Sequence, residues 1–305
     1  MGAAIRRHEY LINTMKQEDR KKGYTLVLTF SRNWCVHNFF ANFLKMKIDL
    51  RNCHMVFFDN TDNALLQESL TYWADIFRDC CLSFRYYKTY RQGTDRTILD
   101  PDIGFKGSKL PFIYAMQQDI VGLVTTDRFV QLEDDTLAPV NAIPRLLSLL
   151  EKHKNCGIAT AIETGRSFEP WIKTRTGVHY LKMKENKLME RISLSPWHKG
   201  LVKVDGCGYY CFATWTHLWK ETFKLMPKDM SDIPRFAMDN IQTNKILVLG
   251  FDILADFSLW CTHMNLTPEK ILFWGRPQAV KMADIWVPRF NEYAQGIILK
   301  DPLKK

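Results

Sequence analysis

The first half of the chain alternates between short apolar runs and longer amphipathic segments. Residues 24–34 and 54–63 each begin with a nearly continuous apolar run and end in polar residues, which is typical of strands buried on both faces of a sheet. Residues 81–90, 128–135 and 156–165 are predicted as three further strands. Five such runs, separated by helix-length segments, predict an α/β domain.

The segments between these runs have helical spacing. Residues 36–46 suit a crossover helix between the first two strands, and Asn63 is a good N-cap for a second helix. Apolar residues after Asn63 recur along one helical face, and a similar stripe follows the fourth strand. The two stripes are Leu66, Leu70, Trp73 and Phe77, then Ile143, Leu146, Leu147 and Leu150. Strands that alternate with helices predict βαβ units and a mainly parallel sheet.

The remaining segments are less regular. Residues 1–23 are polar and charged and are expected to form a helix or a partly ordered arm. Residues 166–200 suit loops and a short hairpin, and residues 201–219 a strand leading into a helix. Residues 239–265 predict a helix ended by Gly250 and then a strand. The expected division is an arm (1–23), an α/β half (24–165) and a second half of the same domain (166–305).

Three predicted strands end in polar tails. Since ligands of parallel sheets bind outside the carboxyl ends of the strands, tails with the sequences SRNW, DNTDN and EDDT indicate a site there. In the last tail Glu133, Asp134 and Asp135 repel one another, so water, a basic partner or a metal ion must compensate them. Glu133 and Asp135 point the same way along an extended chain and Asp134 points oppositely. Carboxylates at a strand end suit Mg²⁺ or Mn²⁺ together with substrate phosphates.

Composition narrows the choice of partner. The 305 residues carry a net charge of +9. This charge suggests an anionic partner such as a nucleic acid, a sugar nucleotide or a membrane surface, and a generally basic surface without such a partner explains it equally well. No apolar run reaches the roughly 18–20 residues of a membrane span, and no targeting segment is visible, so a soluble cytoplasmic protein is expected. A phosphate-loop motif is absent from the sequence, which excludes a phosphate-loop kinase.

The eight cysteines lack the compact spacing of a disulfide framework and are predicted to be reduced thiols. Cys207, Cys211, Cys261 and His263 could be read as a zinc site, but their spacing is poor and burial in the core is the favoured interpretation.

Several segments together resemble one enzyme family. The tripeptide at 29–31, the turn at 59–62, the acidic triplet at 133–135 and residues 106–119 are similar, in order and spacing, to motifs of GT-A-fold glycosyltransferases, especially the family 2-like group. The resemblance spans roughly residues 24–265, although each motif is short. The triplet takes the place of the family's DxD metal motif, with Glu in place of the first Asp.

The resemblance implies a GT-A-type, Rossmann-like, mainly parallel sheet with a nucleotide-sugar-binding half (24–165) and an acceptor-binding half (166–305). It implies Mn²⁺ or Mg²⁺ held by Asp135, with Glu133 and a late His263 as further ligands, and Asp239 as the general base. Whether the reaction inverts or retains stays open. The implied donor-binding residues are Thr29, Ser31, Arg32, Asp59, Asp62, Lys109, Asp134, Gly206 and Gly208.

The implied activity is transfer of a hexosyl or pentosyl group from a nucleotide sugar, with a UDP-sugar favoured, to a hydroxyl acceptor. Basic and aromatic residues are interleaved in residues 167–177, 195–200 and 273–281, so a modified base in DNA is one candidate acceptor beside a glycan or a protein. Two alternatives are a nucleic-acid-binding protein with a catalytically inert α/β domain and a nucleotidyltransferase.

Overall fold

A computed structural model gives the fold. The residues it describes are 6–10, 23–61, 63–90, 110–163, 176–183, 189–194, 198–226, 238–266, 270–274 and 298–300.

Four parallel strands form the centre of the first half. They are β2 (Tyr24–Phe30), β3 (Cys53–Asp59), β4 (Ser83–Tyr90) and β5 (Arg128–Glu133). Their order in the sheet is β4-β3-β2-β5, so the first strand of the four pairs with both the second and the fourth. This arrangement confirms the predicted parallel α/β sheet and brings the carboxyl ends of β2, β3 and β5 to one edge.

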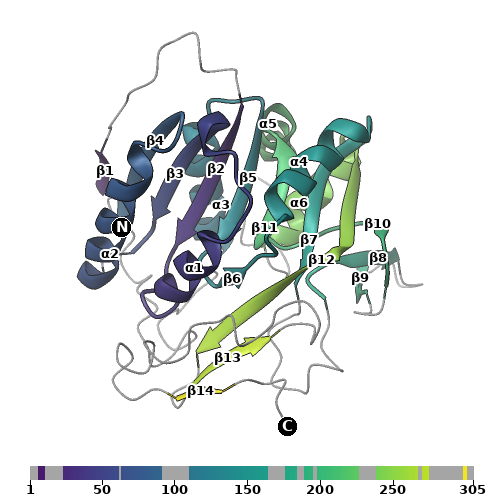
Figure 1. Cartoon of the computed structure of the whole chain (residues 1–305). Helices are drawn as coiled ribbons and strands as arrows, with labels where there is room; N and C mark the ends of the chain where they lie inside the picture. Colours follow the sequence, from purple (N-terminus) through teal and green to yellow (C-terminus); the bar gives the residue numbers. More distant parts are fainter. Residues whose placement is uncertain are drawn as a thin grey trace.

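Helices cover both faces of the sheet (Figure 1). Helices α1, α2 and α4 pack on one face through side chains such as Phe40, Leu66 and Leu146, and helices α3, α5 and α6 pack on the other through Ile120, Trp219 and Ile246. The helices are α1 (Val36–Phe43), α2 (Ala64–Arg78), α3 (Leu110–Leu123), α4 (Ala142–Lys152), α5 (Thr216–Lys224) and α6 (Met238–Val248). As predicted, Asn63 caps α2, with its Oδ1 accepting a 3.0 Å hydrogen bond from the Leu66 amide.

The second half extends the same sheet. Strand β11 (Cys211–Trp215) lies antiparallel between β5 and β7 (Cys156–Glu163), and β12 (Asp252–Leu266) runs parallel to β7. Strand β10 (Leu201–Val204) pairs with β12, so residues 201–219 hold two strands before α5 and not the single strand predicted. The prediction of one strand was wrong because the chain turns at residues 205–210, which include Gly206 and Gly208, between β10 and β11.

The carboxyl-terminal part of β12 shapes the candidate site. The pairing of β12 with β7 shifts register between Ala255 and Trp260, and the end of β12 then pairs with β6 (Thr136–Leu137) and β13 (Lys270–Trp274). In this register His263 lies opposite Thr136, the residue that follows the acidic triplet. The bend therefore carries a late histidine to the end of β5.

The peripheral elements differ from expectation at one point. Within the arm, β1 (Arg6–Tyr10) is a strand antiparallel to β4, so these residues do not form the predicted helix. Pairing there covers the edge of β4, which would otherwise expose unsatisfied backbone groups. The hairpin expected within 166–200 is formed by β8 (His179–Met183) and β9 (Met189–Ser193). Also described are the 3₁₀ turn η2 (Leu50–Asn52) and β14 (Ile298–Lys300).

Candidate functional site

The acidic triplet lies where β5 ends at the carboxyl edge of the sheet. Glu133 is the last residue of β5 and is half-buried, whereas Asp134 and Asp135 are 0% and 1% exposed. The Asp134 amide donates a 3.0 Å hydrogen bond to the Thr29 carbonyl, which ties the triplet to the end of β2. Two adjacent carboxylates are therefore buried here, and burial of charge is costly unless it is compensated.

Arg32 supplies the first compensation. Its guanidinium Nη1 lies 2.5 Å from Asp134 Oδ1, and its Nη2 lies 3.2 Å from Asp135 Oδ2. The other oxygen of Asp134 accepts backbone hydrogen bonds from Ser31 at 2.6 Å and from Arg32 at 2.8 Å. Asp134 thus fastens the loop after β2 to the end of β5, and Arg32 is the basic partner that three adjacent acids require.

One guanidinium does not fully balance these carboxylates. Burial alone would lower the pKa of Arg32, but Asp135, Asp134 and Glu133 outweigh it and raise that pKa above its ordinary value. Burial raises the pKa of Asp134, Arg32 lowers it and Asp135 raises it again, and the net direction is upward. The largest cause of the raised pKa of Asp134 is therefore its burial, to which the charge of the neighbouring Asp135 adds.

His263 and Glu163 complete the cluster from the second half of the chain. His263 Nε2 lies 3.0 Å from Asp135 Oδ2, and its Nδ1 lies 2.9 Å from Glu163 Oε1. Thr136 Oγ1 donates a 3.1 Å hydrogen bond to the other Glu163 oxygen, Oε2. Glu163 was not among the predicted site residues, although a carboxylate near the end of the strand predicted at residues 156–165 was the available signal.

The pair Asp135 and His263 fits one side of a divalent metal site. Cis ligands of an octahedral ion with bonds of about 2.1 Å lie about 3 Å apart, and Asp135 Oδ2 and His263 Nε2 are 3.0 Å apart. A carboxylate oxygen with an imidazole nitrogen suits Mn²⁺. Within the described ranges, no group of three or more His, Cys, Asp or Glu side chains has the arrangement of a complete metal site. Any further ligands would be substrate or water oxygens, as is common for such ions.

Asp59, at the end of β3, lies in a second buried cluster. Its Oδ1 accepts hydrogen bonds from the Thr61 amide at 2.9 Å and the Thr61 hydroxyl at 3.0 Å. Its Oδ2 accepts one from the Tyr86 hydroxyl at 2.8 Å and lies 3.3 Å from Lys88 Nζ, on a lysine that is 2% exposed. Asp59 therefore organises the turn after β3 and neutralises a buried lysine, and its contact with a nucleotide stays a prediction.

Asp239 stands in the first turn of α6, close to the predicted glycine-rich segment. A Cβ on Gly208 would lie 3.3 Å from Asp239 Oδ2 and only 2.7 Å from the Tyr210 ring, and one on Gly206 would collide with the His179 ring. Packing within the protein thus accounts for both glycines. Burial, followed by the charges of Asp239 and Glu133, raises the pKa of Tyr209, which places both carboxylates in one electrostatic neighbourhood.

The other predicted residues are placed as follows. The Thr29 hydroxyl lies 3.4 Å from the Leu132 carbonyl, within the sheet. Asp62 and Lys109 lie outside the described residues. Cys207, Cys211 and Cys261 are buried free thiols, and burial raises the pKa of Cys207 to about 12. These observations agree with a packing role for the three cysteines.

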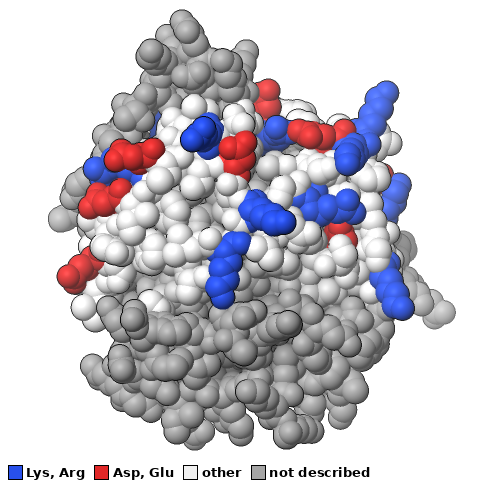
Figure 2. Space-filling model, viewed as in Figure 1, with Lys and Arg blue, Asp and Glu red and all other residues white. Residues whose placement is uncertain are grey.

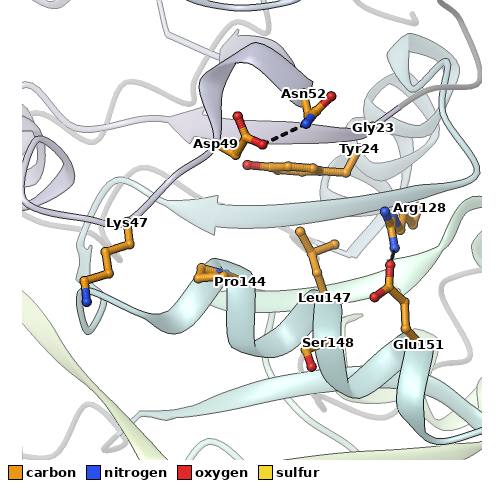
Figure 3. A pocket seen from close by; sticks show the side chains of 10 residues that line it. All are labelled: Gly23, Tyr24, Lys47, Asp49, Asn52, Arg128, Pro144, Leu147, Ser148 and Glu151. Atoms are coloured by element: carbon orange, nitrogen blue, oxygen red, sulfur yellow. Dashed lines mark hydrogen bonds and ion pairs between the residues drawn. The ribbon is translucent and has the colours of Figure 1, made fainter.

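A cavity of about 430 Å³ lies at the opposite, amino-terminal edge of the sheet (Figure 3). The Tyr24 ring faces α4 across it, and Arg128 pairs there with Glu151. The lining residues are Gly23, Tyr24, Lys47, Asp49, Asn52, Arg128, Pro144, Leu147, Ser148 and Glu151. Because Tyr24 and Arg128 are the first residues of β2 and β5, the cavity lies at the other end of these strands from the carboxylate cluster.

Comparison with known proteins shows the fold. No protein-family model matches the sequence, and no curated protein is similar to it. The chain is similar to the crystal structure of GalNAc-T7 with UDP, GalNAc and Mn²⁺, with a TM-score of 0.52 and 13% identity over 92% of this chain and 52% of that one. The chain thus spans about half the length of that protein. At this identity the likeness shows the fold alone, which is the GT-A fold of glycosyltransferases.

Two other solved structures are less similar, with TM-scores below 0.5, and no conclusion about this chain is drawn from them. A mannosyltransferase from Pyrobaculum calidifontis in complex with GDP-Man and Mn²⁺ gives a TM-score of 0.46 and 11% identity over 77% of this chain and 57% of that one. A putative glucose-1-phosphate thymidylyltransferase from Bacillus anthracis gives a TM-score of 0.44 and 10% identity, over 79% of this chain and 89% of that one.

Proposed function

We propose that this chain is a metal-dependent glycosyltransferase that moves a sugar from a nucleotide-sugar donor to a hydroxyl group of an acceptor. The observation that carries the proposal is the approach of Asp135 Oδ2 and His263 Nε2 to 3.0 Å at the carboxyl edge of a GT-A sheet. These residues are 128 positions apart in the chain. Three carboxylates, of Glu133, Asp134 and Asp135, act there on the one guanidinium of Arg32, and a divalent cation would offset both their charge and that of a donor's diphosphate.

The chain's own residues have distinct parts in this proposal. Asp135 and His263 would hold Mn²⁺ or Mg²⁺, and Glu133 would assist at the neighbouring position. When bound, the ion supplies Lewis acidity that neutralises charge on the departing nucleotide. Asp134 and Asp59 would act on the donor mainly through the loops after β2 and β3, because their oxygens already accept hydrogen bonds from those loops.

Asp239 is the proposed general base toward the acceptor hydroxyl. It lies at the amino-terminal end of α6, and it shares with Glu133 an influence on buried Tyr209. The favoured donor is a UDP-sugar, since the structurally similar GalNAc-T7 was crystallised with UDP.

The acceptor is proposed only as a hydroxyl group. Residues 167–175, 195–197 and 275–281, which hold much of the basic and aromatic sequence that suggested DNA, lie outside the described residues. On the described part of the face in Figure 2, Lys and Arg side chains are interleaved with Asp and Glu. In the described part of the chain, no helix has the length and apolarity to cross a membrane.

A donor screen tests this proposal. We expect Mn²⁺ together with one of a panel of UDP-, GDP- and dTDP-sugars to raise the unfolding temperature and to release the nucleoside diphosphate in the presence of a hydroxyl acceptor. Asp135→Asn should lower turnover by about 100-fold or more, as expected when one preorganised electrostatic group is removed. Asp256→Asn, which changes a buried carboxylate of β12 outside the site, is the matched control. If no donor gives a metal-dependent shift, the proposal is wrong.

A further inference from the structure

We propose that Glu163 is a positioning residue that fixes the imidazole of His263 so that Nε2, together with Asp135, faces the divalent cation. The inference rests on the proposed function, because it assigns a new residue to the same site. Glu163 belongs to none of the sequence motifs, and it joins the site only because the fold places it beside His263. Its carboxylate, 7% exposed, is enclosed by the second half of the sheet.

The strand pairing places Glu163 beside the histidine. Glu163 is the last residue of β7 and is paired in parallel register with Cys261 of β12. His263 follows two residues later and therefore projects from the same face of β12 as Cys261. The bend of β12 then directs His263 toward β6, where it lies opposite Thr136. Glu163 thus approaches the histidine from the side away from Asp135.

The contacts define which ring nitrogen faces which carboxylate. Nδ1 lies 2.9 Å from Glu163 Oε1, and Nε2 lies 3.0 Å from Asp135 Oδ2. A histidine that binds a metal offers one nitrogen without a proton and keeps the proton on the other. In the metal-free protein Nε2 also faces a carboxylate, that of Asp135. A cation held by Asp135 and Nε2 would replace a proton there, and Glu163 would then keep the proton on Nδ1, as outer-shell carboxylates do at many metal sites.

Thr136 holds the carboxylate in place. Its hydroxyl donates a 3.1 Å hydrogen bond to Glu163 Oε2, so the two oxygens of Glu163 have separate partners. Thr136 also follows Asp135 directly in the chain, and the Asp135 carbonyl accepts a 2.8 Å hydrogen bond from the Met264 amide beside His263. The threonine, the glutamate and both proposed ligands therefore form one connected group, in which moving Glu163 reorients His263.

Direct measurement of Mn²⁺ binding tests this role. Free Mn²⁺ is quantified by electron paramagnetic resonance during titration of the purified chain, alone and with UDP or GDP. Glu163→Ala should weaken Mn²⁺ binding by about 10–100-fold, the usual cost of losing an outer-shell partner. Glu163→Gln should stay within about threefold of the unmodified chain, because an amide oxygen in the place of Oε1 can accept a hydrogen bond from Nδ1–H. Asp256→Asn, at a buried carboxylate of β12 outside the site, should leave Mn²⁺ affinity unchanged.

The outcomes separate this inference from the proposed function. If the unmodified chain takes up no Mn²⁺ in any arm, the proposed function fails and the inference with it. If it binds Mn²⁺ and Glu163→Ala binds equally well, only the inference is overturned. Equal losses in the Ala and Gln variants, with matching losses of metal-free stability, also overturn it, since they indicate a structural role. Should Glu163→Ala not fold, Thr136→Val replaces it: it removes the hydroxyl that holds Oε2, and weaker Mn²⁺ binding supports the inference while unchanged binding overturns it.

Discussion

Two groups of buried carboxylates lie at the same edge of the sheet, and they differ in how their charge is balanced. At the end of β3, the single carboxylate of Asp59 faces the buried ammonium of Lys88, and Thr61 and Tyr86 donate to its oxygens. Each negative charge in that group has a positive counterpart. The Asp59 group is thus complete without any ligand.

At the end of β5 the balance is different. The acids Asp134, Asp135 and Glu163 face one guanidinium, from Arg32, and one imidazole, from His263. Burial is the first cause of the raised pKa of Asp134, Arg32 opposes it, and the adjacent Asp135 adds to it. The comparison separates a buried ion pair that accounts for itself from the acid-rich group to which the proposed cation is assigned. Substitutions in the metal-free protein can separate the two cases.

The largest loss of stability is expected from Arg32→Met. The substitution leaves Asp134 and Asp135 buried without their cation, and breaking a buried ion pair in this way costs about 3–5 kcal/mol. Urea unfolding without metal measures the loss, and adding Mn²⁺ should restore part of it. Arg78→Met, which removes an exposed i,i+3 pair with Asp75, is the control and should change stability by less than about 1 kcal/mol. A similarly small change for Arg32→Met would contradict its role as counter-ion.

A smaller loss, of about 3 kcal/mol, is expected from Asp59→Asn. Lys88 would then be a buried ammonium facing a neutral amide, although the hydrogen bonds from Thr61 and Tyr86 can persist in part. Unlike the loss in Arg32→Met, this one should not respond to Mn²⁺. Tyr86→Phe removes only the hydrogen bond from the Tyr86 hydroxyl to Asp59 Oδ2 and should cost about 1 kcal/mol. Rescue of Asp59→Asn by Mn²⁺ would show that the two groups are not distinct.

The sequence predicted the positions of the ends of β2, β3 and β5 because apolar runs followed by polar residues are local features. The pairing of Arg32 with Asp134 is not local, since it joins two strand ends 102 residues apart. Lys88 sits in an alternating aromatic strand, and nothing in the local pattern distinguishes a buried lysine from a solvated one. The ion pairs of Arg32 with Asp134 and of Lys88 with Asp59 form only once the strands have become neighbours in the sheet.

The second half shows the same limit more clearly. The local patterns of β7, β11 and β12 fit parallel and antiparallel pairing equally, so the insertion of antiparallel β11 between β5 and β7 could not be predicted. Glu163 meets His263 only because β12 pairs with β7 and then bends. The resemblance to GT-A enzymes predicted His263 as a metal ligand, but it did not predict that Glu163 would be the carboxylate beside it.

A pH-dependent change in stability is expected from Asp256, a carboxylate of β12 outside both groups. Burial would raise its pKa, but Ser258 and Arg145 outweigh burial and lower it. Because the folded pKa lies below the unfolded value near 3.9, this contribution is present above about pH 4 and disappears as pH falls through the folded pKa. Asp256→Asn should thus destabilise the protein at pH 7 and much less at pH 3. Equal effects at both values, measured by urea unfolding, would contradict the lowered pKa.

The smallest change in metal-free stability is expected from Asp135→Asn. Removing this charge weakens the attraction to Arg32, 3.2 Å away, but it also relieves repulsion from the adjacent Asp134. The two effects oppose each other, so the unfolding free energy should stay within about 1 kcal/mol of the unmodified value, while stabilisation by Mn²⁺ is lost. Asp59→Asn is the matched control, since it also neutralises a buried aspartate. Neutralising a buried carboxylate is costly only where a positive charge already matches it. If Asp135→Asn destabilises the metal-free protein as much as Asp59→Asn does, the charges at the end of β5 are therefore balanced without a metal, and the prediction is wrong.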